Sequence, residues 1–435
     1  DLYNEFLGEN EAATLDTMNS LVVTMSKMGK FSDAEPLAIK VYEGRRLAFG
    51  EDDRLTLVAM NNVLGILASS GRYEEALPYA VRLVDSRRRA LGDQDPDTIV
   101  AIINAAKLMR MIGRIEESEA YFEEAVASSE SSLGTEHPVY LDAVSSLGTL
   151  YIATLRFDQA EPLARTSLKS RRALLGEGHP LTLRSQEILY RSLIGQRRTE
   201  EAEPVALERL RISMRELGPR HPTTLSSQVR VAELRIAQER LEEAEASLAE
   251  TVAASLEVFG PMNPQTLATK DKHADVLLLL DRAADALPIY RDIYESRKRA
   301  HGLRDHGTLT TMGGLSQALA KLGELEEAAE LSEGMLSAAR ARFDPSDPRL
   351  GSYLRMRGEM LLDIGNPAGA SEPMLEAYET LTDSLGSDHP QTRDLAAQLA
   401  GLYNAWHAAE PNAGHDAKAR SWQVKAASAE NSISD

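Results

Sequence analysis

Residues 175–183 read Leu-Gly-Glu-Gly-His-Pro-Leu-Thr-Leu, and the pattern around this stretch returns every 42 residues along the chain. Its first glycine recurs at this spacing without an insertion or deletion from Gly8 to Gly302. The next positions in phase are Asp344 and Gly386. A fixed period of this size is typical of a stack of identical supersecondary units, because each unit must bury its apolar face against the next.

One repeat predicts a pair of helices joined by a short turn. Asp95 is a good N-cap, and the proline after it is favoured at the first helical position, so helix A is expected over 96–112. Gly113 makes the turn, and helix B is expected over 115–133. Gly134 then ends helix B at a position suited to left-handed dihedral angles. The position of Asp95 is occupied in other repeats by Asp53, His137, His179, His221, Asn263, Asp347 and His389.

Small residues recur in helix B where the two helices of a repeat are expected to cross closely. One phase holds Ala34, Ala76, Ala160, Ala202, Ala244, Ala286, Ala328 and Ala370, with Ser118 as the exception. Larger side chains there would push the helices apart, so we expect these residues to be buried. By contrast, Gly313 and Gly314 lie in the middle of a helix A and predict a weak point, unless a neighbour packs tightly against them.

Composition limits the possible functions. The net charge of −19 argues against a non-specific nucleic-acid or anionic-membrane role, since both need an excess of Lys and Arg. The absence of cysteine excludes disulfides, thiolate metal sites and cysteine nucleophiles. No stretch approaches 18 consecutive apolar residues, so we expect no membrane insertion and a cytoplasmic location.

Motifs that carry chemistry are not evident. The sequence lacks a phosphate-binding loop, a dinucleotide-binding glycine motif and a nucleophile elbow. The histidines that precede proline lie one repeat apart, which suits capping better than a shared metal ion. His407 and His415 flank a short insertion and are expected to be exposed. We therefore predict a protein that is not an enzyme, with no catalytic residues, no metal and no cofactor.

The repeat resembles the tetratricopeptide repeat in its 42-residue, kinesin-light-chain-like form. Three runs carry the resemblance: residues 175–183, the Gly-Arg-Tyr-Glu-Glu-Ala run at 71–76, and the Ala-Glu-Pro-Leu run at 34–37, which returns at 160–163. The resemblance implies an all-α, right-handed superhelical solenoid of about ten antiparallel helix pairs. The C-terminal end resembles the end of such arrays in bacterial signalling proteins, where they often follow a serine/threonine kinase domain or a signalling ATPase.

The whole chain, residues 1–435, is expected to form one solenoid. Residues 1–8 would be the end of a truncated preceding helix, and residues 9–385 would form nine regular 42-residue units. Residues 386–435 would form an atypical capping unit, because terminal units must shield the stack from water.

The candidate ligand site lies on helix A, which lines the concave face in this family. Asn amides can both donate and accept hydrogen bonds, so they can bind a peptide backbone independently of its sequence. Alternatively, these Asn only bridge neighbouring helices. Nearby cationic residues could favour an acidic ligand. The predicted peptide-binding residues are Asn19, Asn61, Asn62, Asn104, Lys107 and Arg110.

The predicted function is a non-catalytic protein–protein interaction module or scaffold. It would bind a peptide or a partner protein along the concave groove, as part of a larger signalling protein. The alternative is an autoregulatory region that binds its own parent kinase or signalling ATPase. No nucleic-acid partner is expected, and the sequence leaves the oligomeric state open.

Overall fold

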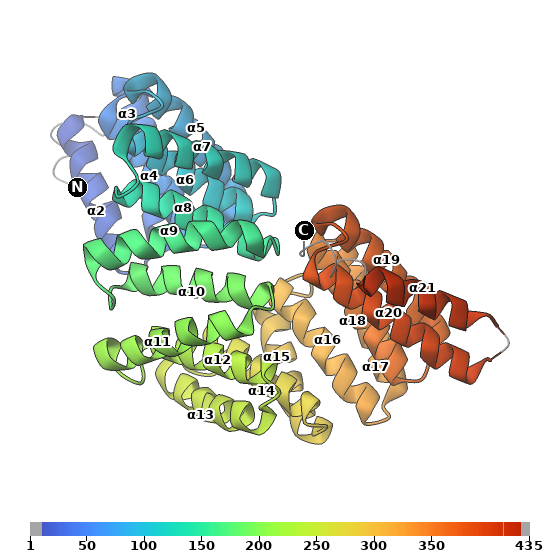
Figure 1. Cartoon of the computed structure of the whole chain (residues 1–435). Coiled ribbons are helices and arrows are strands. Elements are labelled where there is room, and N and C mark those ends of the chain that lie inside the picture. Colours follow the sequence, from blue (N-terminus) through green and yellow to red (C-terminus); the bar gives the residue numbers. More distant parts are fainter. Residues whose placement is uncertain (1–10, 412, 428–435) are drawn as a thin grey trace. The chain divides into compact units, whose positions relative to one another are not determined.

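A computed structural model of the chain describes residues 11–411 and 413–427 (Figure 1). These residues form twenty α-helices, labelled α2 to α21, and contain no β-strand. The predicted all-α class is confirmed. The helices alternate between a helix A, which opens each repeat, and a helix B, which closes it.

Every helix A begins 42 residues after the previous one, which confirms the period read from the sequence. The ten A helices are α2 (Ala12–Lys27), α4 (Arg54–Ser69), α6 (Pro96–Met111), α8 (Pro138–Ala153), α10 (Pro180–Gly195), α12 (Pro222–Ala237), α14 (Pro264–Leu279), α16 (His306–Lys321), α18 (Pro348–Asp363) and α20 (Pro390–Ala409).

The B helices follow the same period up to α19. They are α3 (Phe31–Phe49), α5 (Tyr73–Leu91), α7 (Ile115–Leu133), α9 (Phe157–Leu175), α11 (Thr199–Leu217), α13 (Leu241–Phe259), α15 (Ala283–His301), α17 (Leu325–Arg340), α19 (Pro367–Leu385) and α21 (His415–Ala427). Helix α17 ends three residues early, in the repeat where Asp344 replaces the glycine that follows the other regular B helices. Gly302, at the equivalent position one repeat earlier, has φ of 81°, which glycine adopts readily.

The helix starts are capped by the side chains that the sequence suggested. Asp95 accepts a hydrogen bond from the backbone N–H of Asp97 at 2.8 Å. The Nδ1 atoms of His179 and His221 each accept one from the N–H two residues later, at 3.2 Å. The capping role predicted for these histidines is confirmed, and it requires an unprotonated Nδ1.

The small residues of helix B are buried, as predicted. Ala76, Ala160, Ala202 and Ala244 are fully inaccessible to solvent. The exception, Ser118, is equally buried, and its hydroxyl donates a hydrogen bond to the carbonyl of Ala106 at 2.8 Å. The hydroxyl is therefore satisfied inside the A–B contact, and the position tolerates serine.

Contacts divide the chain into two compact parts, which are described separately. The N-terminal part runs to Tyr151 and includes Gln159–Gly176, and the C-terminal part comprises Ile152–Asp158 and continues from Glu177. Within each part, helices pack against their neighbours in the chain, and successive A helices also contact each other, as α2 does α4 and α12 does α14. The helix end predicted for residues 1–8 lies outside the described residues, and the single-solenoid assignment stays a prediction.

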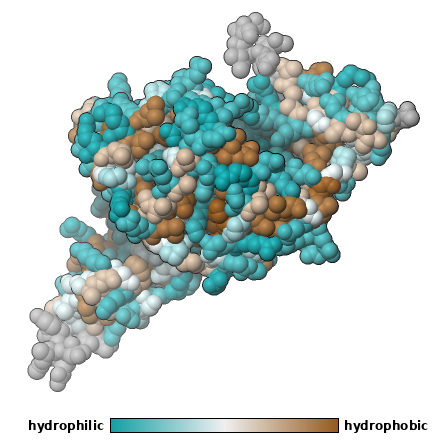
Figure 2. Space-filling view, turned by 90° about the horizontal axis from the view of Figure 1, so that it is seen from below, coloured by the Kyte–Doolittle hydropathy of each residue, from teal (hydrophilic) through white to brown (hydrophobic). Residues whose placement is uncertain are grey.

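The face of the molecule that Figure 2 shows is mainly hydrophilic. On the face that Figure 2 shows, apolar side chains lie in small groups among hydrophilic ones. Within the part of the chain that the structure describes, no helix is long and apolar enough to cross a membrane.

Candidate functional site

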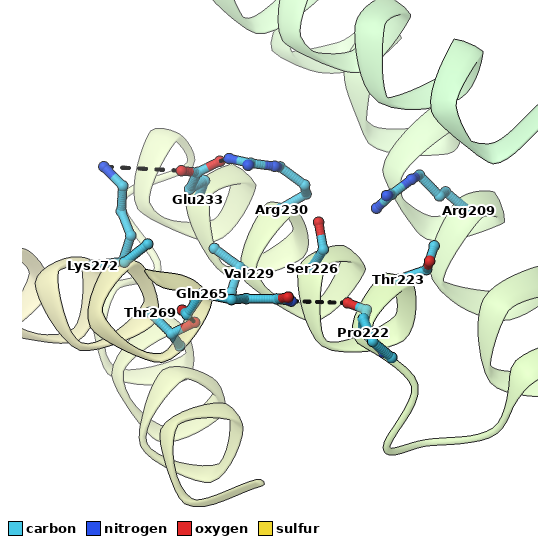
Figure 3. A pocket seen from close by; sticks show the side chains of 11 residues that line it. Arg209, Pro222, Thr223, Ser226, Val229, Arg230, Glu233, Gln265, Thr269 and Lys272 are labelled. Atoms are coloured by element: carbon cyan, nitrogen blue, oxygen red, sulfur yellow. Dashed lines mark hydrogen bonds and ion pairs between the residues drawn. The ribbon is translucent and has the colours of Figure 1, made fainter. Parts of the chain in front are cut away.

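A hollow of the C-terminal part lies between the A helices α12 and α14. Its volume is about 360 Å³. Residues at helical spacing line it, so that one side of each helix faces the space (Figure 3). We call these two sides the groove face; its residues are Pro222, Thr223, Ser226, Val229, Arg230 and Glu233 of α12 with Gln265, Ala268, Thr269 and Lys272 of α14.

A chain of ion pairs runs across the groove face. The Arg230 guanidinium lies 2.6 Å from the Glu233 carboxylate on its own helix and 2.8 Å from the Glu187 carboxylate on α10. The ammonium of Lys272 lies 3.9 Å from Glu233 and 3.4 Å from Asp275 (Figure 3). Three successive A helices are thus linked by charged side chains that remain partly exposed.

The carboxylates of this network hold its two cations in the ionised state. Burial of the Arg230 guanidinium lowers its pKa, but the carboxylates of Glu233 and Glu187 raise it by more, and the net shift is upward. The Lys272 ammonium has a raised pKa chiefly because of Asp275, against the opposing effect of burial. Both cations therefore stay charged at neutral pH and beyond.

Arg209 of α11 lines one side of the hollow. In most other repeats the equivalent position holds an apolar residue. Its side chain is 6% exposed. It donates hydrogen bonds to the carbonyl of Leu183 at 3.2 Å and to the hydroxyl of Ser227 at 2.7 Å. Burial lowers the pKa of its guanidinium. The equivalent position is apolar in six other repeats, at Val41, Leu83, Ala125, Ile293, Met335 and Ala377, and carries a small hydroxyl residue in the two adjacent repeats, at Ser167 and Thr251.

The groove face uses the same positions within the repeat as the site predicted from the sequence; we call such equivalent positions, 42 residues apart, one register. Counting in steps of 42, Asn62 and Asn104 occupy the register of Arg230 and Lys272. Lys107 occupies the register of Glu233. The sequence therefore pointed to these helix positions, but in earlier repeats, and it did not single out their charged equivalents.

The structure places the predicted residues on α2, α4 and α6 of the N-terminal part, and all are half-buried. The Asn62 amide donates a hydrogen bond to the Asn19 amide oxygen at 2.8 Å, so these two bridge neighbouring A helices. Lys107 pairs with Asp142 on α8 at 2.9 Å. Asn61, Asn104 and Arg110 lie on the same helices, and the peptide-binding role of the whole set stays a prediction.

The signal that could have located the groove face was a run of charges that share a register on successive A helices. Arg191, Glu233 and Asp275 share one register, and Arg230 and Lys272 share another. The sequence-based prediction took Asn, Lys and Arg residues of the early A helices and did not follow their positions into the later repeats. Arg209 was not among the residues that the sequence singled out.

The histidines at the tenth repeat differ from expectation. His415 was expected to be exposed, but it is 7% exposed and its ring stacks on Trp406 with centroids 4.1 Å apart. His407 is half-buried. The prediction for His415 was wrong because the ring, at the first residue of α21, packs on Trp406 near the end of α20. In the described residues, no group of three or more His, Asp or Glu is placed to hold a metal ion.

Family models for the tetratricopeptide repeat match the chain in several segments. One model matches residues 55–131, 104–172 and 265–341, and a second matches residues 14–54. Together they span more than half of the chain. No curated protein matches it.

Solved structures that match the chain include the nearly identical TPR-like repeats of a kinesin light chain from Podosopora anserina. That protein is 22% identical, with a TM-score of 0.40 over 48% of this chain and 98% of the other. RapI in its apo form is 14% identical, with a TM-score of 0.51 over 66% of this chain and 98% of RapI.

A Rap protein complexed with competence and sporulation factor is 10% identical, with a TM-score of 0.54 over 90% of this chain and all of the Rap protein. At these identities the two Rap structures show a common fold only. The strict 42-residue period, the paired A and B helices and the matching family models lead to one conclusion. The chain belongs to the tetratricopeptide repeat family.

Proposed function

We propose that this protein is a non-catalytic interaction module that binds an extended peptide, or an extended segment of a partner protein, along the side of the A helices. One observation carries the proposal. The hollow between α12 and α14 is lined by polar side chains in the same register on successive A helices. A ligand that crosses one helix after another would meet equivalent positions at each step.

The chemistry of the groove face suits a polar, extended ligand. Hydroxyl, amide and charged groups can bind a backbone or side chains, and they lose little by staying hydrated before a ligand arrives. The side chain of Gln265 already donates a hydrogen bond to the carbonyl of Pro222 in the preceding repeat, at 2.9 Å. This contact shows that an amide on one A helix can reach a backbone carbonyl at the start of the preceding A helix.

In the N-terminal part, we propose the equivalent role for Asn19, Asn61, Asn62, Asn104, Lys107 and Arg110. Asn62 contacts the preceding A helix as Arg230 does, through a partner 43 residues earlier in each case. Bridging neighbouring helices and binding a ligand are compatible for such residues, because an amide that forms one hydrogen bond keeps further donor and acceptor capacity.

The experiment is a selection from a random peptide library on the purified chain, followed by affinity measurements on the selected peptides by fluorescence anisotropy. Replacing Arg230 and Lys272 together with Gln should weaken binding about tenfold or more, which corresponds to about 1.4 kcal/mol or more. Arg220→Gln is the matched control. This arginine lies in the loop before α12, is 64% exposed and pairs with Glu257 away from the groove face.

Unchanged affinity in the double variant, with the expected fold intact by circular dichroism, would contradict the proposal.

The larger protein in which such an array works is proposed to be a signalling protein. Capture of its own upstream domain, with no peptide selected from the library, would instead favour an autoregulatory role.

A further inference from the structure

The start of α20 contacts two inter-helix turns that lie far away in the sequence, all within the C-terminal part. His389 lies 2.9 Å, through Nε2, from the carbonyl oxygen of Leu155, in the turn before α9. Its ring stacks with that of Phe157, with centroids 6.1 Å apart and planes at 25°. Asp394 forms an ion pair with Arg197, in the turn before α11.

The hydrogen bonds of His389 determine which ring nitrogen carries the proton in the neutral imidazole. Its Nδ1 accepts a hydrogen bond from the N–H of Gln391 at 3.2 Å, as in the other His-Pro caps. The proton of the neutral ring must therefore be on Nε2, and Nε2–H donates to the Leu155 carbonyl. One side chain thus caps α20 and also joins it to a turn 234 residues earlier.

The two turns have an unusual backbone for their sequence. Leu155 and Arg197 have φ of 64° and 61°, in the left-handed region that disfavours side chains. The equivalent turn position holds glycine in five other repeats, at Gly29, Gly71, Gly113, Gly323 and Gly365. At Arg197 a glycine would remove the guanidinium that reaches Asp394. The strained residue thus supplies a contact that the usual residue could not.

We propose that His389 and Asp394, together with Leu155, Phe157 and Arg197, form a clasp that closes the C-terminal part on itself and opens to admit a partner to the A helices between its ends. The groove face on α12 and α14 lies between the clasped elements in the chain order. A closed clasp restricts the ways in which a long, extended ligand can reach that face.

The clasp is built to open. Arg197 is 66% exposed and Asp394 27% exposed, so water and salt screen their attraction. His389 adds a hydrogen bond to a backbone carbonyl and a ring stack with Phe157.

The test measures a distance in the full chain, without a ligand, so its outcome is independent of the proposed function. The chain has no cysteine, so Glu200→Cys and Ser387→Cys place two spin labels without competing sites. Both positions are exposed beside the clasp. Double electron–electron resonance should give a short, narrow distance distribution for this otherwise unchanged protein.

Charge reversal separates a clasp from a passive contact. Arg197→Glu should shift the distribution to longer and broader distances, because two carboxylates then face each other. Arg197→Asp combined with Asp394→Arg should restore the short distance. Arg220→Glu, which reverses a charge in a different exposed pair, should leave it unchanged.

Two results would overturn the proposal. One is a broad, long distribution in the unreversed protein. The other is a short distance that Arg197→Glu leaves unchanged.

Discussion

At the scale of the residue, one register on the A helices shows how a single geometry accepts different chemistry. Asn62 bonds to Asn19, and Arg230 pairs with Glu187, at the same separation in the chain. In the eighth repeat this register holds Gly314, and the ring of Tyr290 occupies the space that a side chain would take. The backbone therefore fixes the direction of the side chain at this position. The type of residue determines whether it bridges two helices, lines a groove or leaves space for a neighbouring ring.

Gly314 gives the first prediction. A Cβ there would lie 2.6 Å from the Tyr290 ring, whose hydroxyl donates a hydrogen bond to Asp275 at 2.6 Å. Gly314→Ala should destabilise the protein by about 1–3 kcal/mol through overpacking. The control is Gly65→Ala, in open space on α4, which should stabilise by up to about 1 kcal/mol through helix propensity. Urea unfolding of both variants decides the matter, and equal effects would contradict the packing explanation.

A second prediction concerns the turn at Glu239, which has φ of 62°. Its equivalents in five other repeats are glycines, and its side chain is exposed. Glu239→Gly should relieve the backbone and stabilise the fold by about 0.5–1 kcal/mol, after the added flexibility of the unfolded chain is subtracted. A higher urea midpoint is the expected reading, and a lower midpoint would show that the turn is not strained.

At the scale of the element, a buried polar network joins α14, α15 and α16. Asp271 of α14 forms an ion pair with Arg297 of α15 and accepts a hydrogen bond from the Thr311 hydroxyl of α16 at 3.1 Å. Arg297 also donates to the carbonyl of Gly307 at 2.9 Å. Burial raises the pKa of Asp271 to about 6, and the charge of Arg297 opposes this rise without cancelling it.

The third prediction is a pH dependence with a defined sign. The folded state binds the Asp271 proton more tightly than the unfolded chain, whose aspartate has a pKa of about 3.9. The contribution is therefore fully present below about pH 4 and is lost as the pH rises through about 6. Relative to Asp271→Asn, the wild-type protein should gain about 2–3 kcal/mol of unfolding free energy between pH 7 and pH 4. A pH-independent difference between the two proteins would rule out this assignment.

At the scale of the whole molecule, the repeat made the helices predictable. The helix starts follow from an N-cap residue and a proline at a fixed period, as at Asp95 and His179, so local chemistry was sufficient. The buried phase of Ala160 follows from helical spacing. These features depend on residues close in the chain, and the structure confirms them.

Features that depend on distant residues could not be predicted in the same way. Gly313 and Gly314 suggested a weak point, but side chains of Met356 and Tyr290 fill the space beside them. The contact between His389 and Leu155 joins residues more than five repeats apart. The helix positions that line the groove could be predicted from the 42-residue period. The ion pairs between them could not, because they depend on the distance between neighbouring A helices.

A cross-linking map shows whether the ligand binds to the A helices. A peptide selected on the purified chain would carry a photoreactive group and be cross-linked to it, and mass spectrometry would locate the attachment sites. We expect attachment on the groove face, within residues 222–233 of α12 and 265–272 of α14, and reduced attachment when Arg230 and Lys272 are replaced with Gln. Attachment confined to B helices such as α11 and α13, unaffected by these replacements, would contradict this expectation.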